Sequence, residues 1–144
     1  MTRLAWIPHL SPAYALAVAL RHEVLRVPLG LRFTEAQLAS EADSHHLALF
    51  DGERLVGTLL LTPREGGAVQ MRQVAVDPNR QGGGVGRSLV EEAERFARQQ
   101  GFARMTLHAR DTAVGFYERL GYAAVGDPFV EVGIPHQGME KPLD

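Results

Sequence analysis

The spacing of apolar residues along the chain changes its period, and the first third has the period of a helix. A short apolar run at residues 4–7 predicts a strand, which Pro8 stops. Ser11 and Pro12 then form a typical helix start, because a capping hydroxyl precedes a proline at the first helical position. Apolar residues follow at every third or fourth position, which predicts a helix. Its expected apolar stripe consists of Leu16, Leu20, Val24 and Val27.

Pro28 and Gly30 are expected to end this first helix. Residues 34–37, Thr-Glu-Ala-Gln, have the pattern of a capping box and predict a second short helix. Two helices joined by the irregular segment 28–33 would make a wall over a binding cleft.

The next part of the chain has the patterns of β-strands. Apolar runs at residues 46–50 and 54–62 flank Asp51-Gly52, which is a strong hairpin signal. The second run is apolar at consecutive positions and therefore on both faces. We expect it to be a central strand that is covered on both sides.

The strand expected at residues 68–76 contains a change of phase. Val69 and Met71 occupy odd positions, whereas Val74 and Val76 occupy even ones. Because side chains alternate faces along a strand, this shift predicts a β-bulge near residues 72–73. A bulge would splay the strand from its neighbour and free backbone N–H and C=O groups for an extended, amide-bearing ligand. An irregular sheet edge would explain the same pattern.

The second half predicts the remaining elements. Val85, Leu89, Ala93 and residues 96–97 have helical spacing, which predicts a helix over 84–100 that Gly101 ends. A strand at 104–109 and a short helix at 113–120, capped by Asp111 or Thr112, follow. The last two strands are expected at 122–125 and 129–134, with Pro135 breaking the second. These elements predict one mixed α/β domain over residues 1–144.

Composition narrows the class of protein. The chain has 144 residues, 45% of them apolar, a formal net charge of −2 and no cysteine. The missing cysteines exclude disulfides, thiolate metal sites and a cysteine nucleophile. No run has the length of a membrane span, no secretion signal is visible, and no basic stripe suggests nucleic-acid binding. We therefore expect a cytoplasmic protein that uses no metal and binds neither membrane nor nucleic acid.

Residues 74–89 combine a strand, a glycine cluster and a helix start, which is the arrangement of an anion-binding loop. Glycines let backbone N–H groups approach a phosphate, and a helix N-terminus adds unpaired donors and the positive end of its dipole. A P-loop does not fit, because Gln81 and Arg87 stand where it requires glycine and lysine. The dinucleotide fingerprint fits only in part and lies too late in the chain for a large parallel sheet.

Gln81, Gly84 and Gly86 form the pattern Gln-x-x-Gly-x-Gly, which resembles the acyl-CoA pyrophosphate loop of the GCN5-related N-acetyltransferases (GNAT). Residues 116–122, Phe-Tyr-Glu-Arg-Leu-Gly-Tyr, resemble the helix and strand that follow this loop in the family. The order of elements is similar over nearly the entire chain. Residues 133–139 are also similar to small bacterial-type members.

This resemblance implies the fold and the cofactor site. The implied fold is a mostly antiparallel, twisted sheet flanked by helices and splayed at a bulged central strand. The implied cosubstrate is acetyl-CoA. The residues expected to bind it are Val74, Val76, Gln81, Gly82, Gly84, Gly86, Arg87 and Phe116. The chain departs from the family at Arg110, which stands where many members have an asparagine near the cofactor.

The implied reaction is acetyl transfer to a primary amine of a small molecule, by direct attack in a ternary complex. A backbone N–H of Val74 or Val76 would stabilise the oxyanion, and Tyr117 would protonate the leaving thiolate. Because Phe116 is adjacent, one of the two rings must face away from the core, and we expect it to be Tyr117. The base that takes the proton of the amine stays open among His108, Glu131, His136 and water.

Other interpretations stay open for some of these residues. Arg80 or Arg87 could pair with another phosphate of the cofactor, and Arg21 or Arg26 could bind a carboxylate or phosphate of the substrate. Solvent exposure would explain all four arginines. Two alternatives to the small-molecule enzyme remain: a protein or peptide N-acetyltransferase, and an acyl-CoA-binding sensor without turnover. The protein could also form a homodimer, as family members often do.

Overall fold

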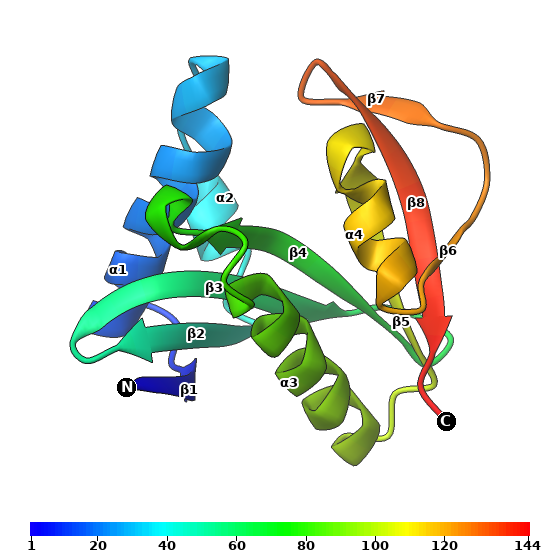
Figure 1. Cartoon of the computed structure of the whole chain (residues 1–144), viewed down its shortest axis with the longest axis horizontal. Coiled ribbons are helices and arrows are strands. Elements are labelled where there is room, and N and C mark those ends of the chain that lie inside the picture. Colours follow the sequence, from blue (N-terminus) through cyan, green and yellow to red (C-terminus); the bar gives the residue numbers. More distant parts are fainter.

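A computed structural model describes all 144 residues. The chain folds into an eight-stranded sheet with helices on both faces (Figure 1). The strand order is β1-β2-β3-β4-β5-β8-β6, and β7 pairs with β8. All neighbouring strands are antiparallel except β4 and β5, which are parallel. The strands are β1 (Thr2–Ile7), β2 (His45–Asp51), β3 (Arg54–Pro63), β4 (Ala68–Val76), β5 (Arg104–Arg110), β6 (Ala123–Ala124), β7 (Phe129–Glu131) and β8 (Ile134–Pro142). The α-helices are α1 (Pro12–Arg21), α2 (Glu35–Ala39), α3 (Val85–Gln99) and α4 (Val114–Arg119).

Helices α1 and α3 cover opposite faces of the sheet. Leu47 and Leu49 of β2 belong to the apolar cluster that contains α3, whereas Ala48 and Phe50 belong to the cluster that contains α1. Alternate residues of one strand point to opposite faces, so the two clusters lie on either side of the sheet. Residues 55–61 of β3 are all buried, which confirms the prediction of a central strand.

Helix α3 packs unusually close to β3 at Gly57. A Cβ atom at this position would lie 2.6 Å from Cγ1 of Val85 and 2.9 Å from Cδ1 of Leu89. Both distances are shorter than ordinary van der Waals contacts, so only glycine allows this approach. The contact holds the first turn of α3, and with it the glycine loop, against the centre of the sheet.

The sequence correctly predicts the start of α1 but only part of the face that it buries, since Leu20 is in the core and Val24 packs against it. The hydroxyl of Ser11 accepts a hydrogen bond from the N–H of Tyr14 at 3.2 Å, as a capping residue does. Leu16 and Val27 are 49% and 55% exposed, however, and the buried residues of α1 include Tyr14 and the charged Arg21. Arg21 is buried because its ion-pair partner, Glu41, comes from a segment twenty residues later.

Helix α1 continues as irregular helical turns rather than ending cleanly at a proline. A π-helical turn, His22–Arg26, follows it and leads into a 3₁₀ turn, Val27–Leu29. Gly30 then ends the helical path in the left-handed conformation, with φ of 70°. The expected capping box is confirmed, since the side chains of Thr34 and Gln37 each bond to the backbone of the other.

The predictions for the last third of the chain need two corrections. Neither Asp111 nor Thr112 caps α4; they form a 3₁₀ turn with Ala113, which precedes α4 without a side-chain cap. Pro135 does not break the last strand. Residues 129–133 form only the short β7 and a turn, and β8 starts at Ile134, passes through Pro135 and pairs with all of β5. Pro135 is tolerated because it is the second residue of the strand and the ladder with β5 begins only at the next residue, His136.

The predicted bulge in β4 is confirmed at Gln73. Leu60 of β3 pairs with Arg72, but Thr58 pairs with Ala75, so β4 contains one extra residue between these pairs. Gln73 takes up this residue with a positive φ of 55°. No helix of the structure is both long enough and apolar enough to cross a membrane.

Candidate active site

Strands β4 and β5 pair over less than half of β4 and then separate. Their parallel ladder joins Ala68–Met71 to Arg104–Leu107 and ends at the pair Met71–Leu107. Beyond this point Arg72, Ala75 and Val76 of β4 pair only with β3, while residues 108–110 of β5 pair only with β8. The gap begins at the bulged residue, which confirms the expected splay (Figure 1).

The backbone of β4 beyond the bulge directs two N–H groups toward this gap. The N–H of Asp77 donates to the carbonyl of Val56 on β3 at 2.8 Å. Because N–H groups alternate sides along a strand, those of Val74 and Val76 point the other way, to the side where β5 has left the sheet. They are therefore donors without a strand partner.

A cavity of about 470 Å³ opens at this gap. Segments that are distant in the sequence line it: the π-helical turn after α1, the bulged part of β4, the end of β5, α4 and the β7–β8 turn. Among its lining residues are Gln73, Val74 and Tyr117, and also the histidines and Glu131 that the sequence offers as bases.

Tyr117 lies in the core but reaches this cavity. It is only 7% exposed and belongs to the α3-side apolar cluster, whereas Phe116 is half-buried. The expectation that Tyr117 faces away from the core is therefore wrong. Its hydroxyl makes no hydrogen bond within the chain. The only side-chain nitrogen or oxygen atom that is both unpaired and sealed from solvent is Nε of Arg21, so the hydroxyl of Tyr117 is not sealed. The hydroxyl of Tyr117 therefore opens into the cavity that its ring lines.

Burial raises the pKa of Tyr117 to about 12. The phenol thus stays protonated at any physiological pH and can act as a donor. Burial in the same site would also raise the pKa of a thiol, because burial disfavours any charged form. The pKa values of the phenol and the thiol are therefore raised together, so burial of both need not prevent proton transfer from the phenol to the thiolate.

Phe116 connects α4 to the start of α3. Its Cζ atom lies 3.3 Å from the position that a Cβ of Gly86 would occupy, so the ring stands directly against the first turn of α3. Gly86 is a glycine because a side chain there would press on this ring. Phe116 thereby places the two sequence motifs side by side, although thirty residues separate them in the chain.

The glycine loop holds a row of unpaired backbone donors. The first bond of α3 runs from the N–H of Ser88 to the carbonyl of Gly84, and the N–H groups of Gly82, Gly84, Val85, Gly86 and Arg87 donate to no group of the chain. Gly82 and Gly84 have φ of 83° and 86°, which favour glycine. Side chains of Gln81 and Arg87 border the loop, and Arg87 is exposed and pairs only loosely with Glu91 at 3.4 Å.

The expected site residues therefore fall into two neighbouring groups. Val74 and Tyr117 line the cavity, whereas Val76, Phe116 and the glycine loop lie outside its lining. Arg80 is paired with Asp51. Arg110, the departure from the family pattern, lines the cavity and donates to the carbonyl of Leu25 at 3.4 Å.

The three side chains that the sequence offers separately as bases form one cluster. Nδ1 of His108 lies 3.0 Å from Oε1 of Glu131, and Nε2 of His136 lies 3.8 Å from Oε2 of the same carboxylate. The ring of Phe129 packs against both imidazoles. The sequence could not reveal this cluster, because it depends on β8 pairing with β5 through Pro135.

Arg21 and Arg26 have different environments. Arg21 is 1% exposed and makes a bidentate ion pair with Glu41, with N–O distances of 2.8 and 2.6 Å. The hydroxyl of Tyr14 donates to the same carboxylate at 2.8 Å. Arg21 is therefore a structural residue and not a substrate ligand. Arg26 lines the cavity and has no carboxylate partner.

Comparison with known proteins identifies the family to which the chain belongs. The family described as "Acetyltransferase (GNAT) domain" matches residues 30–143. The chain belongs to the GNAT family, and we assign it N-acetyltransferase activity. Members of this family take the acetyl group from acetyl-CoA.

Individual relatives agree with this assignment. YjcF of Bacillus subtilis (strain 168), described as an N-acetyltransferase, is 30% identical over 70% of this chain and 72% of its own. Another B. subtilis protein described as an acetyltransferase is 41% identical, but over only 42% of each chain, so the match spans less than half of that relative. A crystal structure described as an N-acetyltransferase from Lactobacillus plantarum has a TM-score of 0.87 and 29% identity, and covers 99% of this chain and 98% of its own.

Proposed function

We propose that this chain, as a single domain over residues 1–144, transfers the acetyl group of acetyl-CoA to a primary amine of a small molecule in a ternary complex. One observation carries the proposal: unpaired N–H groups of β4 and the hydroxyl of Tyr117 converge on the gap between β4 and β5. The cavity at this gap, about 470 Å³, has a size typical of small-molecule sites.

The cofactor would span two regions. Its pyrophosphate would bind the unpaired N–H groups of residues 82–87, with Gln81 and Arg87 at the rim. Its pantetheine arm would take the place of the missing strand beside Val74 and Val76, with Phe116 against it. The N–H of Val74 or Val76 would then hydrogen-bond the thioester oxygen.

The chemistry balances with groups of this chain. The nitrogen lone pair of the neutral amine attacks the thioester carbon, the C–N bond forms, and negative charge on the oxygen is stabilised by a β4 N–H. The C–S bond then breaks, and the thiolate receives the proton of the Tyr117 hydroxyl. The proton lost by the amine passes to the Glu131–His108 pair, and solvent returns a proton to Tyr117. The products are the N-acetylated amine and CoA with a free thiol.

A parallel ligand titration tests the proposal. A ligand that binds only the folded state raises the melting temperature. We expect acetyl-CoA and CoA to raise it, NAD and ATP to have no effect, and small primary amines to release free thiol from acetyl-CoA. A rise with NAD or ATP instead, or none with acetyl-CoA, would rule the proposal out. Binding without turnover of any amine or peptide would favour a sensor, and turnover of peptides alone would favour a protein N-acetyltransferase.

A further inference from the structure

The cavity at the β4–β5 gap is rich in arginine, although the chain as a whole has a net charge of −2. Four arginines from four different segments line it: Arg26, Arg64, Arg72 and Arg110. The one carboxylate in its lining is Glu131, which is already shared between His108 and His136.

None of the four arginines makes an ion pair, since none has a carboxylate oxygen within 4.0 Å of its guanidinium. Their partners are neutral. Arg64 bonds the amide oxygen of Gln70 at 2.9 Å, Arg72 bonds the hydroxyl of Thr62 at 3.2 Å, and Arg110 bonds the carbonyl of Leu25. Arg26 lies over the ring of Phe33, 4.6 Å from its centre.

Three of these guanidinium groups are also partly removed from water. Arg26, Arg72 and Arg110 are half-buried. Burial lowers the pKa of Arg26, and the positive charges of Arg21 and Arg110 lower it further. Burial likewise lowers the pKa of Arg72. Desolvated like charges destabilise one another, so an arrangement of this kind is expected where an anion binds.

Arg26 and Arg72 lie on the face of the sheet that carries α1 rather than on the face that carries α3 and the glycine loop. Met71 belongs to the apolar cluster of α3, so Arg72, the next residue, points to the opposite face. That face carries α1 and the π-helical turn with Arg26. An anion among these arginines would therefore be separate from the phosphates of a cofactor at the start of α3.

We propose that the acceptor amine also carries an anionic group, a carboxylate or a phosphate, and that Arg26, Arg72 and Arg110 bind this group, with Arg64 at the rim. The inference rests on the proposed function for the acceptor role alone; the anion site itself follows from the geometry. Glu131 lies in the same cavity and suits the amine, so the acceptor has the charges of an amino acid or an aminoalkyl phosphate.

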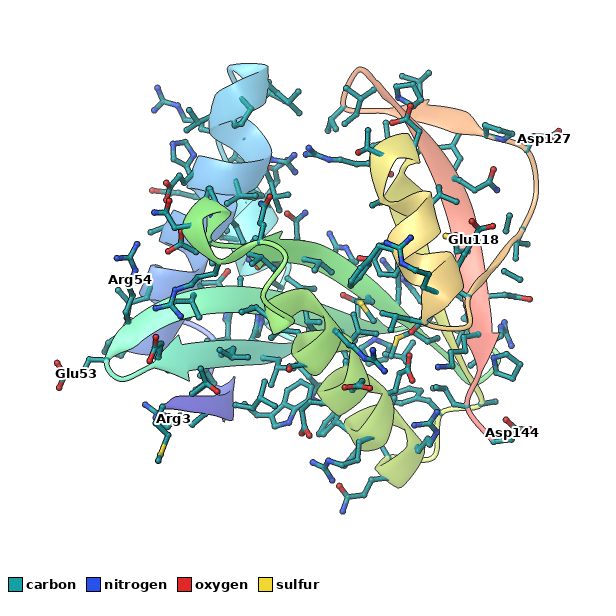
Figure 2. All side chains as sticks on the ribbon, in the orientation of Figure 1. Arg3, Glu53, Arg54, Glu118, Asp127 and Asp144 are labelled. Atoms are coloured by element: carbon teal, nitrogen blue, oxygen red, sulfur yellow. The ribbon has the colours of Figure 1, made fainter.

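Anion binding is tested first, because it does not depend on activity. Glutarate and inorganic phosphate, which lack an amine, are titrated into the full chain in the presence of saturating CoA, so that the glycine loop is already occupied. Sodium chloride of equal ionic strength is the reference, and the melting temperature is followed. We expect saturable stabilisation by at least one of the two anions, and which one distinguishes carboxylate from phosphate. The variant Arg26→Gln/Arg72→Gln should lose this effect, whereas Arg3→Gln should keep it. Arg3 lies on the edge strand β1, at the far side of the sheet (Figure 2).

The acceptor is tested next with matched amines. Amino acids, their carboxamides and aminoalkyl phosphates are compared by thiol release from acetyl-CoA. A charge-assisted hydrogen bond contributes about 1.5–3 kcal/mol, so an anionic acceptor should exceed its neutral amide by roughly 10- to 100-fold in kcat/KM. Arg72→Gln should abolish this preference without changing the affinity for acetyl-CoA.

The outcomes separate the two proposals. Absent acetyl-CoA binding would overturn the proposed function, whatever the anions do. Absent saturable anion binding, or an anion effect that survives in Arg26→Gln/Arg72→Gln, would overturn the anion site. A wild-type enzyme that acetylates the carboxamides as well as the acids would also overturn it. The fold supplies a further control: since Arg72 has no carboxylate partner, Arg72→Gln should leave the melting temperature unchanged or raise it, whereas a structural arginine would lower it.

Discussion

Met71 on β4 and Leu107 on β5 form the last pair of the only parallel ladder in the sheet. Two residues further along β4, Gln73 adopts a positive φ and the two strands no longer pair. The gap, its unpaired donors and its cavity all begin at this point. The proposed site therefore depends on one extra residue in one strand.

The role of Tyr117 is tested by removing its hydroxyl. A positioned general acid contributes roughly 10²- to 10⁴-fold to the rate, so Tyr117→Phe should lower kcat by at least 10²-fold. Its affinity for acetyl-CoA, measured by calorimetry, should stay within about twofold of wild type. The packing of the ring is retained, so the melting temperature should change little.

Tyr122 offers a matched control. It packs edge-on against Tyr117, with ring centroids 5.7 Å apart, but its hydroxyl donates to the buried Glu94 at 2.9 Å. Tyr122→Phe should lower the melting temperature, because Glu94 loses a hydrogen bond, and should leave kcat nearly unchanged. Equal loss of kcat in both variants would show that the tyrosine cluster acts only through packing.

The glycine loop is tested with two glycines of the same conformation. Gly84 and Gly101 have φ of 86° and 87°, and a Cβ at either would meet no atom within 4 Å. Alanine at each position should therefore have a similar cost in stability, roughly 1–2 kcal/mol. Only Gly84→Ala, which disturbs the unpaired N–H groups at the start of α3, should weaken acetyl-CoA binding, by about tenfold in calorimetry. Equal affinities in the two variants would argue against a pyrophosphate site at this loop.

Glu131 is tested as part of the proton acceptor. Glu131→Gln keeps the shape of the side chain and its ability to hydrogen-bond His108, but removes the charge. We expect kcat to fall by 10²-fold or more at neutral pH, with unchanged affinity for acetyl-CoA. The distant and exposed Glu53, at the β2–β3 hairpin in Figure 2, provides the control Glu53→Gln. Full activity of Glu131→Gln would instead assign the proton to water.

The free energy of unfolding is expected to decrease as the pH is lowered. The cause is the buried cluster of Tyr14, Arg21, Glu41 and His46. Burial lowers the pKa of His46 below its ordinary value of 6.5. Burial acts to raise the pKa of Glu41, but the hydrogen bonds and charge of Arg21 outweigh it and lower this pKa below 4.5. The unfolded chain therefore binds more protons in both ranges, so the free energy of unfolding should decrease as pH falls through 6.5 and again below 4.5.

The same cluster predicts the effect of one substitution. Glu41→Gln leaves the charge of Arg21 buried without a counter-ion, which should lower the free energy of unfolding by about 3–5 kcal/mol. The decrease of stability below pH 4.5 should also become shallower. Denaturant unfolding across this pH range measures both effects, with Glu53→Gln as the exposed control. A change below 1 kcal/mol would mean that the pair contributes little.

The sequence predicted those features that depend on short-range patterns. The helical spacing from Val85 to Ala97, the cap at Ser11 and the phase change around Gln73 are each local, and each is present in the structure. The loop was also recognisable, because Gly84 has a positive φ and a side chain at Gly86 would press on Phe116.

Features that depend on long-range contacts could not be predicted. The burial of Arg21 requires Glu41, and the burial of Tyr117 requires α4 to pack against β5 in the apolar cluster of α3. Pro135 looked like a strand breaker because the sequence does not show that the ladder between β5 and β8 begins only at His136. The arginines of the cavity come from four segments, and no local pattern connects them.

The most direct test of the central claim is the hydrogen exchange of individual β4 amides, measured by NMR without and with acetyl-CoA. We predict that the amides of Val74 and Val76 exchange rapidly in the free protein and become strongly protected by the cofactor. The amide of Asp77, which donates to Val56 of β3, is the internal control and should be protected in both states. If acetyl-CoA binds while the Val74 and Val76 amides keep exchanging freely, the cofactor does not occupy the gap between β4 and β5, and the proposed mechanism is wrong.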